Sequence, residues 1–326
     1  MYTRSLKNVM INFKEVFGKK KIDVIEQLIT LDREFLIGEY VLKLKESHVI
    51  DKFYNKYPLY DRFLPVLCSE FYGLVIDIGA NIGDTAIAIF SQNKNLFIVG
   101  VEPDPIFFEE CQININANNL QNNFLEINKF VSSKKGFFKI EKNDTESTGH
   151  VVSVQAEESS ISTISFSELM NLIPEFRKTN FDILKIDTDG FDWDVLKSFL
   201  EYSNLNKNIP RFIFFEMQTF LNNEELLNNN RDNLIKSYKE SLKKIKESGY
   251  THFCLFDNFG THIKVTNSLN EIYDLMDYIN RSQIINKFAT IYYFDVLAFS
   301  ENELIYVNDS LNKFYKNAHN TRPSDI

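Results

Sequence analysis

The chain has 326 residues, of which 44% are apolar and 14% aromatic, and its net charge is −9. This composition supports a sizeable core and excludes general disorder. The acid excess argues against a nucleic-acid partner, which would need a basic face to neutralise phosphates. Its three cysteines are far apart and form no Cys-x-x-Cys pair, which argues against a disulfide framework or zinc knuckle and fits a cytoplasmic protein. No apolar stretch reaches the roughly 18 residues of a transmembrane helix, and the opening residues do not resemble a signal peptide.

Residues 1–70 are predicted to form an N-terminal helical segment. Val24, Leu28, Leu31 and Phe35 fall at helical intervals, and further apolar residues widen this stripe. Its width indicates burial against a neighbouring part of the chain or against a second copy, as in a homodimer. The segment could cover the substrate side and contribute specificity, or only support the fold.

The segment Leu74–Asp84 is predicted to form the central ligand-binding corner. A short apolar run ends in Asp77 and is followed by a turn that contains Gly79 and Gly83. Helical spacing resumes over Thr85–Phe90. A buried strand that leads through a glycine turn into a helix is the ligand-binding corner of an open α/β sheet.

The polar residues of this corner narrow the class of ligand. The turn has no lysine and lacks the third glycine of a dinucleotide fingerprint, so a phosphate cradle is disfavoured. Asp77 and Asp84 make the corner acidic, which repels phosphate and favours a cation. S-adenosylmethionine (SAM) fits these requirements, because it is a nucleoside with an ammonium and a sulfonium group and no phosphate.

The next strand, Leu96–Val101, ends in a second acid, Glu102. Glu102 lies 19 residues after Gly83, close to the roughly 20 at which a strand-end acid meets ribose hydroxyls. An ionised carboxylate can accept both hydroxyl protons. Asp104 and Pro105 then open a helix, in which Asp104 is either the N-cap or a ligand.

The remaining chain continues as alternating strands and helices. A third strand is expected over 124–131, followed by Ser132 and Ser133 where an adenine ring would lie, and then by a hairpin formed by 136–140 and 151–154. The later strands are expected at 181–187, 211–216, 252–257 and 291–300. The tail, residues 301–326, is polar and expected to be partly disordered.

Three stretches resemble the successive motifs of FkbM-type SAM-dependent methyltransferases. They are Ile76–Gly83, Val101–Pro103 and Ile183–Gly190, and the likeness extends from about residue 60 to about residue 250. It implies an α/β fold with a seven-stranded Rossmann-like class I methyltransferase sheet over residues 71–300. The chain departs from the family pattern at Asp187-Thr-Asp189-Gly190, where the family usually has Asp-Val-Glu-Gly.

The motifs and their flanks supply the residues expected to bind the cofactor. These are Asp77, Gly79, Asn81, Gly83, Asp84, Thr85, Glu102, Pro103, Asp104, Val131 and Ser132.

A second set of polar residues is expected to act on the acceptor. Lys185, Asp187 and Asp189 are spaced so that a continuous strand would point all three to one side, and Glu216 ends the next strand. One acid, Asp187 first, could remove the proton of a hydroxyl acceptor while the site aligns it for in-line methyl transfer. Alternatively, Asp187, Asp189 and Glu216 could hold Mg²⁺ or Ca²⁺. Lys185 is either a participant or a neutralising partner.

The favoured function is SAM-dependent O-methylation of a hydroxyl on a sugar, glycan or related metabolite, which is a carbohydrate modification. Two other classes stay open. One is an NAD-linked Rossmann oxidoreductase, which the missing third glycine disfavours. The other is a non-catalytic binding or scaffold module with the SAM-binding fold.

Overall fold

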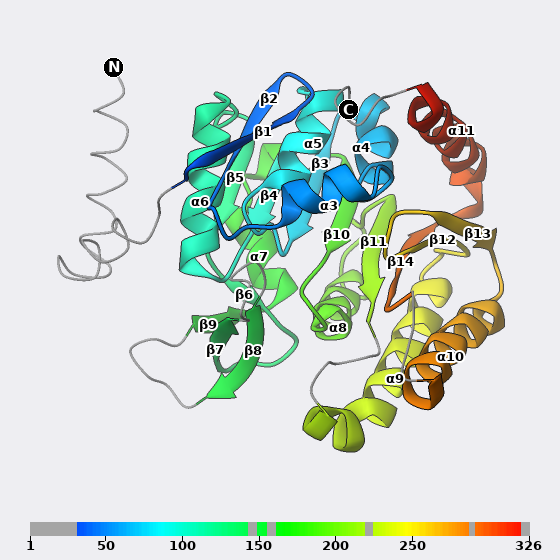
Figure 1. The fold of residues 1–326 in the computed structure, drawn as a ribbon. Coiled ribbons are helices and arrows are strands. Elements are labelled where there is room, and N and C mark those ends of the chain that lie inside the picture. Colours follow the sequence, from blue (N-terminus) through cyan, green and yellow to red (C-terminus); the bar gives the residue numbers. More distant parts are fainter. Residues whose placement is uncertain (1–30, 143–148, 155–160, 219–223, 287–290, 321–326) are drawn as a thin grey trace.

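The computed structural model describes residues 31–142, 149–154, 161–218, 224–286 and 291–320. Within these residues an eight-stranded sheet forms the centre of the molecule (Figure 1). In spatial order its strands are β13 (His262–Thr266), β12 (His252–Asp257), β14 (Phe294–Phe299), β11 (Phe212–Met217), β10 (Phe181–Ile186), β3 (Leu74–Ile78), β4 (Phe97–Val101) and β5 (Phe124–Ile127).

The strand order confirms the predicted Rossmann-like sheet and adds one edge strand. The five strands from β11 to β5 are parallel, and β14 inserts antiparallel between β11 and β12. These seven strands match the predicted seven-stranded sheet, and β13 extends it as an eighth strand. The chain order reverses between β3 and β10, and such a switch point is where open α/β sheets bind ligands.

Helices cover both faces of this sheet. They are α3 (Ile50–Lys56), α4 (Phe63–Leu67), α5 (Asp84–Gln92), α6 (Pro105–Ala117), α7 (Phe166–Leu172), α8 (Asp192–Ser203), α9 (Glu224–Glu247), α10 (Leu269–Asn286) and α11 (Leu304–Asn320). One apolar cluster joins a face of the sheet to α7, α8, α9 and α10, and a second joins the other face to α4, α5, α6 and α11. Both faces of the central strands are therefore buried, which explains their almost continuous apolar sequences.

The prediction of a helical N-terminal segment is wrong for residues 33–44. Arg33–Ile37 (β1) and Tyr40–Leu44 (β2) form an antiparallel hairpin in which Ile37 faces Tyr40. The turn begins with Gly38 at φ 59°, as a tight hairpin with a first-position glycine requires. The apolar run was too short to distinguish a period of two from a helical period. The helices α3 and α4 that follow agree with the prediction, whereas Val24 and Leu28 lie outside the described residues.

The prediction of a partly disordered tail is wrong for residues 301–320. A helix, α11, occupies Leu304–Asn320 and buries Val307, Leu311 and Phe314. The Phe314 ring packs edge-on against Phe63 of α4, with 5.7 Å between the ring centroids. Leu304, Tyr306 and Tyr315 of the same helix also pack against this cluster, so α11 has an apolar face toward the core.

A small second sheet lies beside the central one. It contains β6 (Phe130–Val131), β7 (Phe137–Lys142), β8 (Gly149–Val154) and β9 (Ile161–Ile164). Its antiparallel pair β7–β8 confirms the predicted hairpin. The predicted third strand, 124–131, divides between the two sheets as β5 and β6.

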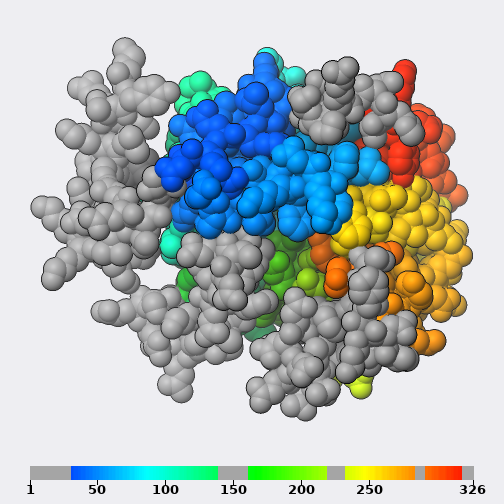
Figure 2. Space-filling model, viewed as in Figure 1, coloured from blue at the N-terminus to red at the C-terminus, as the bar shows by residue number. Residues whose placement is uncertain are grey.

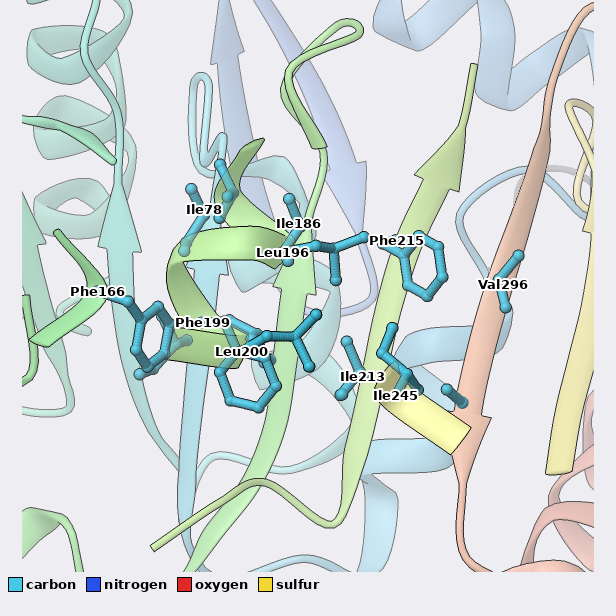
Figure 3. Packing of buried hydrophobic residues seen from close by; sticks show 14 of the residues in the cluster. Ile78, Phe166, Ile186, Leu196, Phe199, Leu200, Ile213, Phe215, Ile245 and Val296 are labelled. Atoms are coloured by element: carbon cyan, nitrogen blue, oxygen red, sulfur yellow. The ribbon is translucent and has the colours of Figure 1, made fainter. Parts of the chain in front are cut away.

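Helix α8 follows the loop after β10 and packs against the sheet. Figure 3 shows Leu196, Phe199 and Leu200 of α8 packed against Ile186 and Ile213 of the sheet. All five side chains are at most 4% exposed. The packing holds the start of α8, and with it the end of β10, at the switch point.

We expect Phe199→Ala to lower the free energy of unfolding by about 3–5 kcal/mol, because a fully buried ring is removed from a packed interface. Chemical denaturation followed by circular dichroism measures this loss. Leu205→Ala, at a side chain that is 85% exposed, is the control and should change the unfolding free energy by at most about 0.5 kcal/mol. Equal losses in both variants would contradict this packing.

Candidate cofactor and acceptor site

A buried ion pair lies at the switch point between β3 and β10. The two strands are in register so that Lys185 is opposite Asp77. Lys185 Nζ lies 2.9 Å from Asp77 Oδ1 and 3.2 Å from Asp187 Oδ2. Burial lowers the pKa of Lys185, but the carboxylates of Asp187 and Asp77 raise it well above its ordinary value. Lys185 is therefore an ammonium that neutralises its two neighbours.

The turn after β3 requires glycine because two backbones meet there. Gly79 has φ 88°, and a Cβ at this position would lie 1.7 Å from the carbonyl oxygen of Asp187. The Asp187 N–H donates to the Ile78 carbonyl over 2.9 Å, which holds the two strand ends together. The same turn contains Asn81 at φ 46° and Gly83 at φ 83°, so three of its residues are left-handed.

Glu102 lies against this turn, in agreement with the predicted spacing. It is 7% exposed and accepts hydrogen bonds from the N–H groups of Asn81 and Asp104, over 2.9 and 2.8 Å. Burial raises the pKa of Glu102 to about 8, although these two N–H donors lower it. The carboxyl thus joins the first turn to the end of the second strand.

Asp77 is the most deeply buried acid of the corner. It has no exposed surface, and burial raises its pKa to about 6 despite the neighbouring Lys185. Its Oδ1 accepts from Lys185, whereas its Oδ2 has no hydrogen-bond partner among the described residues. Such an orphaned acceptor carries a desolvation cost that a bound donor would remove.

Three other residues predicted to bind the cofactor lie at the starts of helices α5 and α6. Asp84 and Thr85 are buried at the start of α5, where Asp84 accepts from the Tyr54 hydroxyl over 3.2 Å and burial raises its pKa. Asp104 is confirmed as the N-cap of α6 and accepts from the N–H groups of Ile106 and Phe107.

The adenine side of the predicted site is tied to α8. Val131 and Ser132 are buried, and Ser132 Oγ and Ser133 Oγ each lie 2.5 Å from the carboxylate of Asp194. The Pro103 carbonyl accepts from the Asn128 side chain over 3.0 Å. These bonds fix the backbone around the predicted adenine side of the site.

The predicted acceptor acids lie together, but their roles differ from the prediction. Asp187, the acid named first as a possible base, has a side chain that is 50% exposed and paired with Lys185. Strand β10 ends at Ile186, and Asp189 has φ 49°, so the expected one-sided alignment does not continue to Asp189. Partial burial, with Asp187 and Asp192 nearby, raises the pKa of Asp189 to about 7.

Glu216 is 6% exposed at the end of β11. Burial, then the charges of Asp187 and Asp192, raise its pKa well above the ordinary value. Its own N–H donates to Asp192 Oδ1 over 3.0 Å. The charge of Asp189 also contributes to the raised pKa of both Glu102 and Glu216.

Two further acids of this edge were missed in the sequence. Asp295 is opposite Glu216 in the β11–β14 pair, and its pKa is raised well above the ordinary value by burial and by Asp61. Asp61 lies in the turn between α3 and α4 at φ 53°, and desolvation and Asp187 raise its pKa to about 7. The start of the family likeness near residue 60 was the available signal for Asp61. Asp295 had none, because an antiparallel strand brings it to this edge.

The carboxyl groups do not form a recognisable metal centre. In the described ranges, no group of three or more histidine, cysteine or acidic side chains is arranged as the ligands of a metal ion. The metal alternative for Asp187, Asp189 and Glu216 therefore has no preformed ligand set to support it.

The sequence motifs at this edge match a known family. The model of the methyltransferase FkbM domain matches residues 77–251, from the ion-paired aspartate of β3 to the start of β12. This chain belongs to the FkbM methyltransferase family. Membership confirms the resemblance and makes the chain a SAM-dependent methyltransferase.

Solved structures that resemble this FkbM protein are also methyltransferases by their titles. One is a human methyltransferase 10 domain containing protein, with 10% identity, coverage of 71% of this chain and 72% of that chain, and a TM-score of 0.36. Another is a precorrin-6y C5,15-methyltransferase from Geobacter metallireducens, with 10% identity, coverage of 76% of this chain and 99% of that chain, and a TM-score of 0.35. A third is the plantazolicin methyltransferase BpumL in complex with SAH, with 10% identity, coverage of 78% of this chain and 87% of that chain, and a TM-score of 0.39. These likenesses are too distant to inform on the acceptor. A comparison with curated proteins found no matching sequence. None of the helices in the described residues combines the length and apolar character needed to cross a bilayer.

We expect Lys185→Met to destabilise the protein by about 3–5 kcal/mol at pH 8, because it leaves Asp77 charged, buried and unpaired. The loss should shrink at pH 5, since the pKa of Asp77 is already raised and rises further without its ammonium. Urea unfolding at the two pH values measures the difference.

Lys236→Met is the control, because Lys236 forms only an exposed helix pair with Glu240 and should lose at most about 0.5 kcal/mol. The double variant Asp77→Asn with Lys185→Met should recover much of the stability. A pH-independent loss in Lys185→Met would contradict the buried pair.

Proposed function

We propose that this FkbM methyltransferase transfers a methyl group from SAM to a hydroxyl of a neutral, hydroxyl-rich acceptor such as a sugar or glycan. The observation that carries the proposal is the position of two acid sets on one sheet edge. Asp77 and Glu102 lie at the glycine turn, and Asp189 and Glu216 lie beside them at the ends of the next strands. The first set is assigned to the cofactor and the second to the acceptor.

The residues of the corner fit SAM better than they fit a phosphate-bearing nucleotide. The unpartnered Oδ2 of Asp77 is an acceptor that an ammonium donor could satisfy, and Glu102 supplies acceptors for ribose hydroxyls. Among the described residues of β3, β4, β10 and β11, Lys185 is the only lysine, and it is already shared by Asp77 and Asp187. Three left-handed residues in the turn let the backbone approach a ligand closely.

The chain's own contribution to the reaction is alignment and proton removal. SAM, when bound, supplies a methyl group on a sulfonium leaving group. A hydroxyl becomes a competent nucleophile only as it loses its proton, so a base must lie within hydrogen-bond reach of it. We assign this role to Asp189 rather than Asp187, because the Asp187 side chain is 50% exposed and held by the Lys185 ammonium. Asp189 has a pKa of about 7, and its charge raises the pKa of both Glu102 and Glu216.

The other acids favour an acceptor that donates hydrogen bonds and carries no negative charge. We assign Glu216, Asp295 and Asp61 to the acceptor side, and burial is the chief cause of their raised pKa values. An anionic acceptor would add to their mutual repulsion. Neutral hydroxyl groups can instead donate to the carboxylates and accept from the protonated carboxyls.

Ligand binding separates this proposal from an NAD-linked oxidoreductase. We expect SAM at a hundredfold excess over its Kd to stabilise the protein by about 2.7 kcal/mol, which thermal unfolding detects as a higher Tm. NAD⁺ at the same concentration should leave Tm unchanged. Stabilisation by NAD⁺ alone would overturn the proposal.

We expect Asp189→Asn to lower kcat about 100-fold or more, because a general base typically contributes this much. For the wild type, kcat should rise with pH up to about 7 and then level off, since the base acts when deprotonated. Methyl transfer from labelled SAM to a panel of neutral sugars and oligosaccharides measures both effects.

The matched control is Asp182→Asn, because Asp182 lies on the same strand at its far end, where it accepts from Gly73 N–H and pairs with Arg211. Its kcat should stay within about twofold of the wild type. Full activity of Asp189→Asn would exclude this base. Loss of turnover in EDTA would restore the metal alternative, and SAM binding without turnover on any acceptor would favour the scaffold alternative.

A further inference from the structure

Side-chain amides of α6 attach the N-terminal hairpin to this helix. They form hydrogen bonds with the backbone of β2 that a neighbouring strand would otherwise form. Val41 N–H donates to Asn118 Oδ1 over 2.9 Å, and Asn118 Nδ2 donates back to the Val41 carbonyl over 2.7 Å. Lys43 repeats the pattern with Asn114, over 2.7 and 3.2 Å. The two asparagines are four residues apart and so share one face of the helix. Figure 1 shows the hairpin lying across α5 and α6.

Asn114 makes one further bond that Asn118 does not make. Its Nδ2 also donates to the carbonyl of Ile82 over 3.0 Å, whereas Asn118 Nδ2 also donates to the carbonyl of Asn114 in its own helix, over 2.8 Å. Ile82 lies between Asn81 and Gly83, inside the left-handed turn of the cofactor corner. Asn114 has no exposed surface. One buried carboxamide thus connects β2 to the turn after β3.

The segment that follows the hairpin adds two contacts on the same side of the turn. Lys45 Nζ lies 2.5 Å from Glu110 Oε1, and Glu110 is fully buried on α6, one helical turn before Asn114. His48 is 6% exposed, and burial lowers its pKa while Glu110 and Asn81 act in the opposite direction. The hairpin and residues 45–48 therefore lie on the α6 side of the cofactor turn and support it there.

We infer that Asn114 is a positioning residue for the cofactor turn. Through Asn114 the N-terminal hairpin contributes to the affinity of the site for its cofactor. The inference rests on the proposed function for the identity of the cofactor. The family match begins at residue 77, so the hairpin lies outside the matched segment.

The physical reason is the conformation of the turn. Left-handed backbone costs free energy for a residue with a Cβ, although asparagine tolerates it better than most, and surrounding contacts help to hold Asn81 in it. The Asn81 N–H is the donor to Glu102, so a shift at Ile82 would move the group that orients the ribose acid. A turn that is already ordered costs less to bind, which is the effect of preorganisation on affinity.

The test compares Asn114→Ala with Asn118→Ala, using SAM as the probe. Each variant removes hydrogen bonds to β2, so both should lower Tm. Only Asn114→Ala removes the bond to Ile82, and we expect it to raise the Kd for SAM about tenfold in isothermal titration calorimetry. Asn118→Ala should keep the wild-type Kd within about twofold.

Two results would overturn the inference: an unchanged Kd in Asn114→Ala, or an equal rise in both variants, which would reflect general loosening of the hairpin. If Asn114→Ala does not fold, Asn114→Ser, which keeps a small polar side chain, replaces it with the same expected direction. Absence of SAM binding by the wild type would instead count against the proposed cofactor, so the two failures are distinguishable.

Discussion

The ion pair of Lys185 and Asp77 is the constraint on which the rest of the site depends. Neither group has appreciable exposure, so each needs the other to remain charged at the centre of the sheet. The pair forms only when β3 and β10 are in their observed register, because a shift by one residue would place the two side chains on opposite faces of the sheet. Since Lys185 also pairs with Asp187, the same ammonium joins the cofactor side of the edge to the acceptor side.

A single lysine cannot neutralise all the acids that the topology gathers around it. Asp189 and Asp61 are left in partly desolvated positions beside other carboxyls, and their pKa values rise to about 7. Groups with such pKa values can exchange protons near neutral pH, which suits a base for hydroxyl acceptors. The desolvation and mutual repulsion of the acids at the strand ends thus raise the pKa values on which the proposed proton transfer depends.

The cofactor corner was predictable because its information is local. The strand, the glycine turn and the helix start lie within eleven consecutive residues, and Glu102 is found by counting from Gly83. The close approach of Gly79 to the Asp187 carbonyl explains why one of these glycines was so informative. In contrast, the hairpin at 33–44 was mistaken for a helix, since its alternation is short and its burial depends on α5 and α6.

The sequence by itself determined the chain order of the seven central strands, the acidic residues of the corner, and the family. Only the tertiary structure decided which acids share the edge, because Asp61 and Asp295 are brought there by a turn and an antiparallel strand far from the motifs. It also decided that Asp187 is paired and exposed, and that Asn114 links β2 to the turn at Ile82. Whether a side chain is buried or paired depends on the residues around it. For these groups, those residues come from segments distant in the chain.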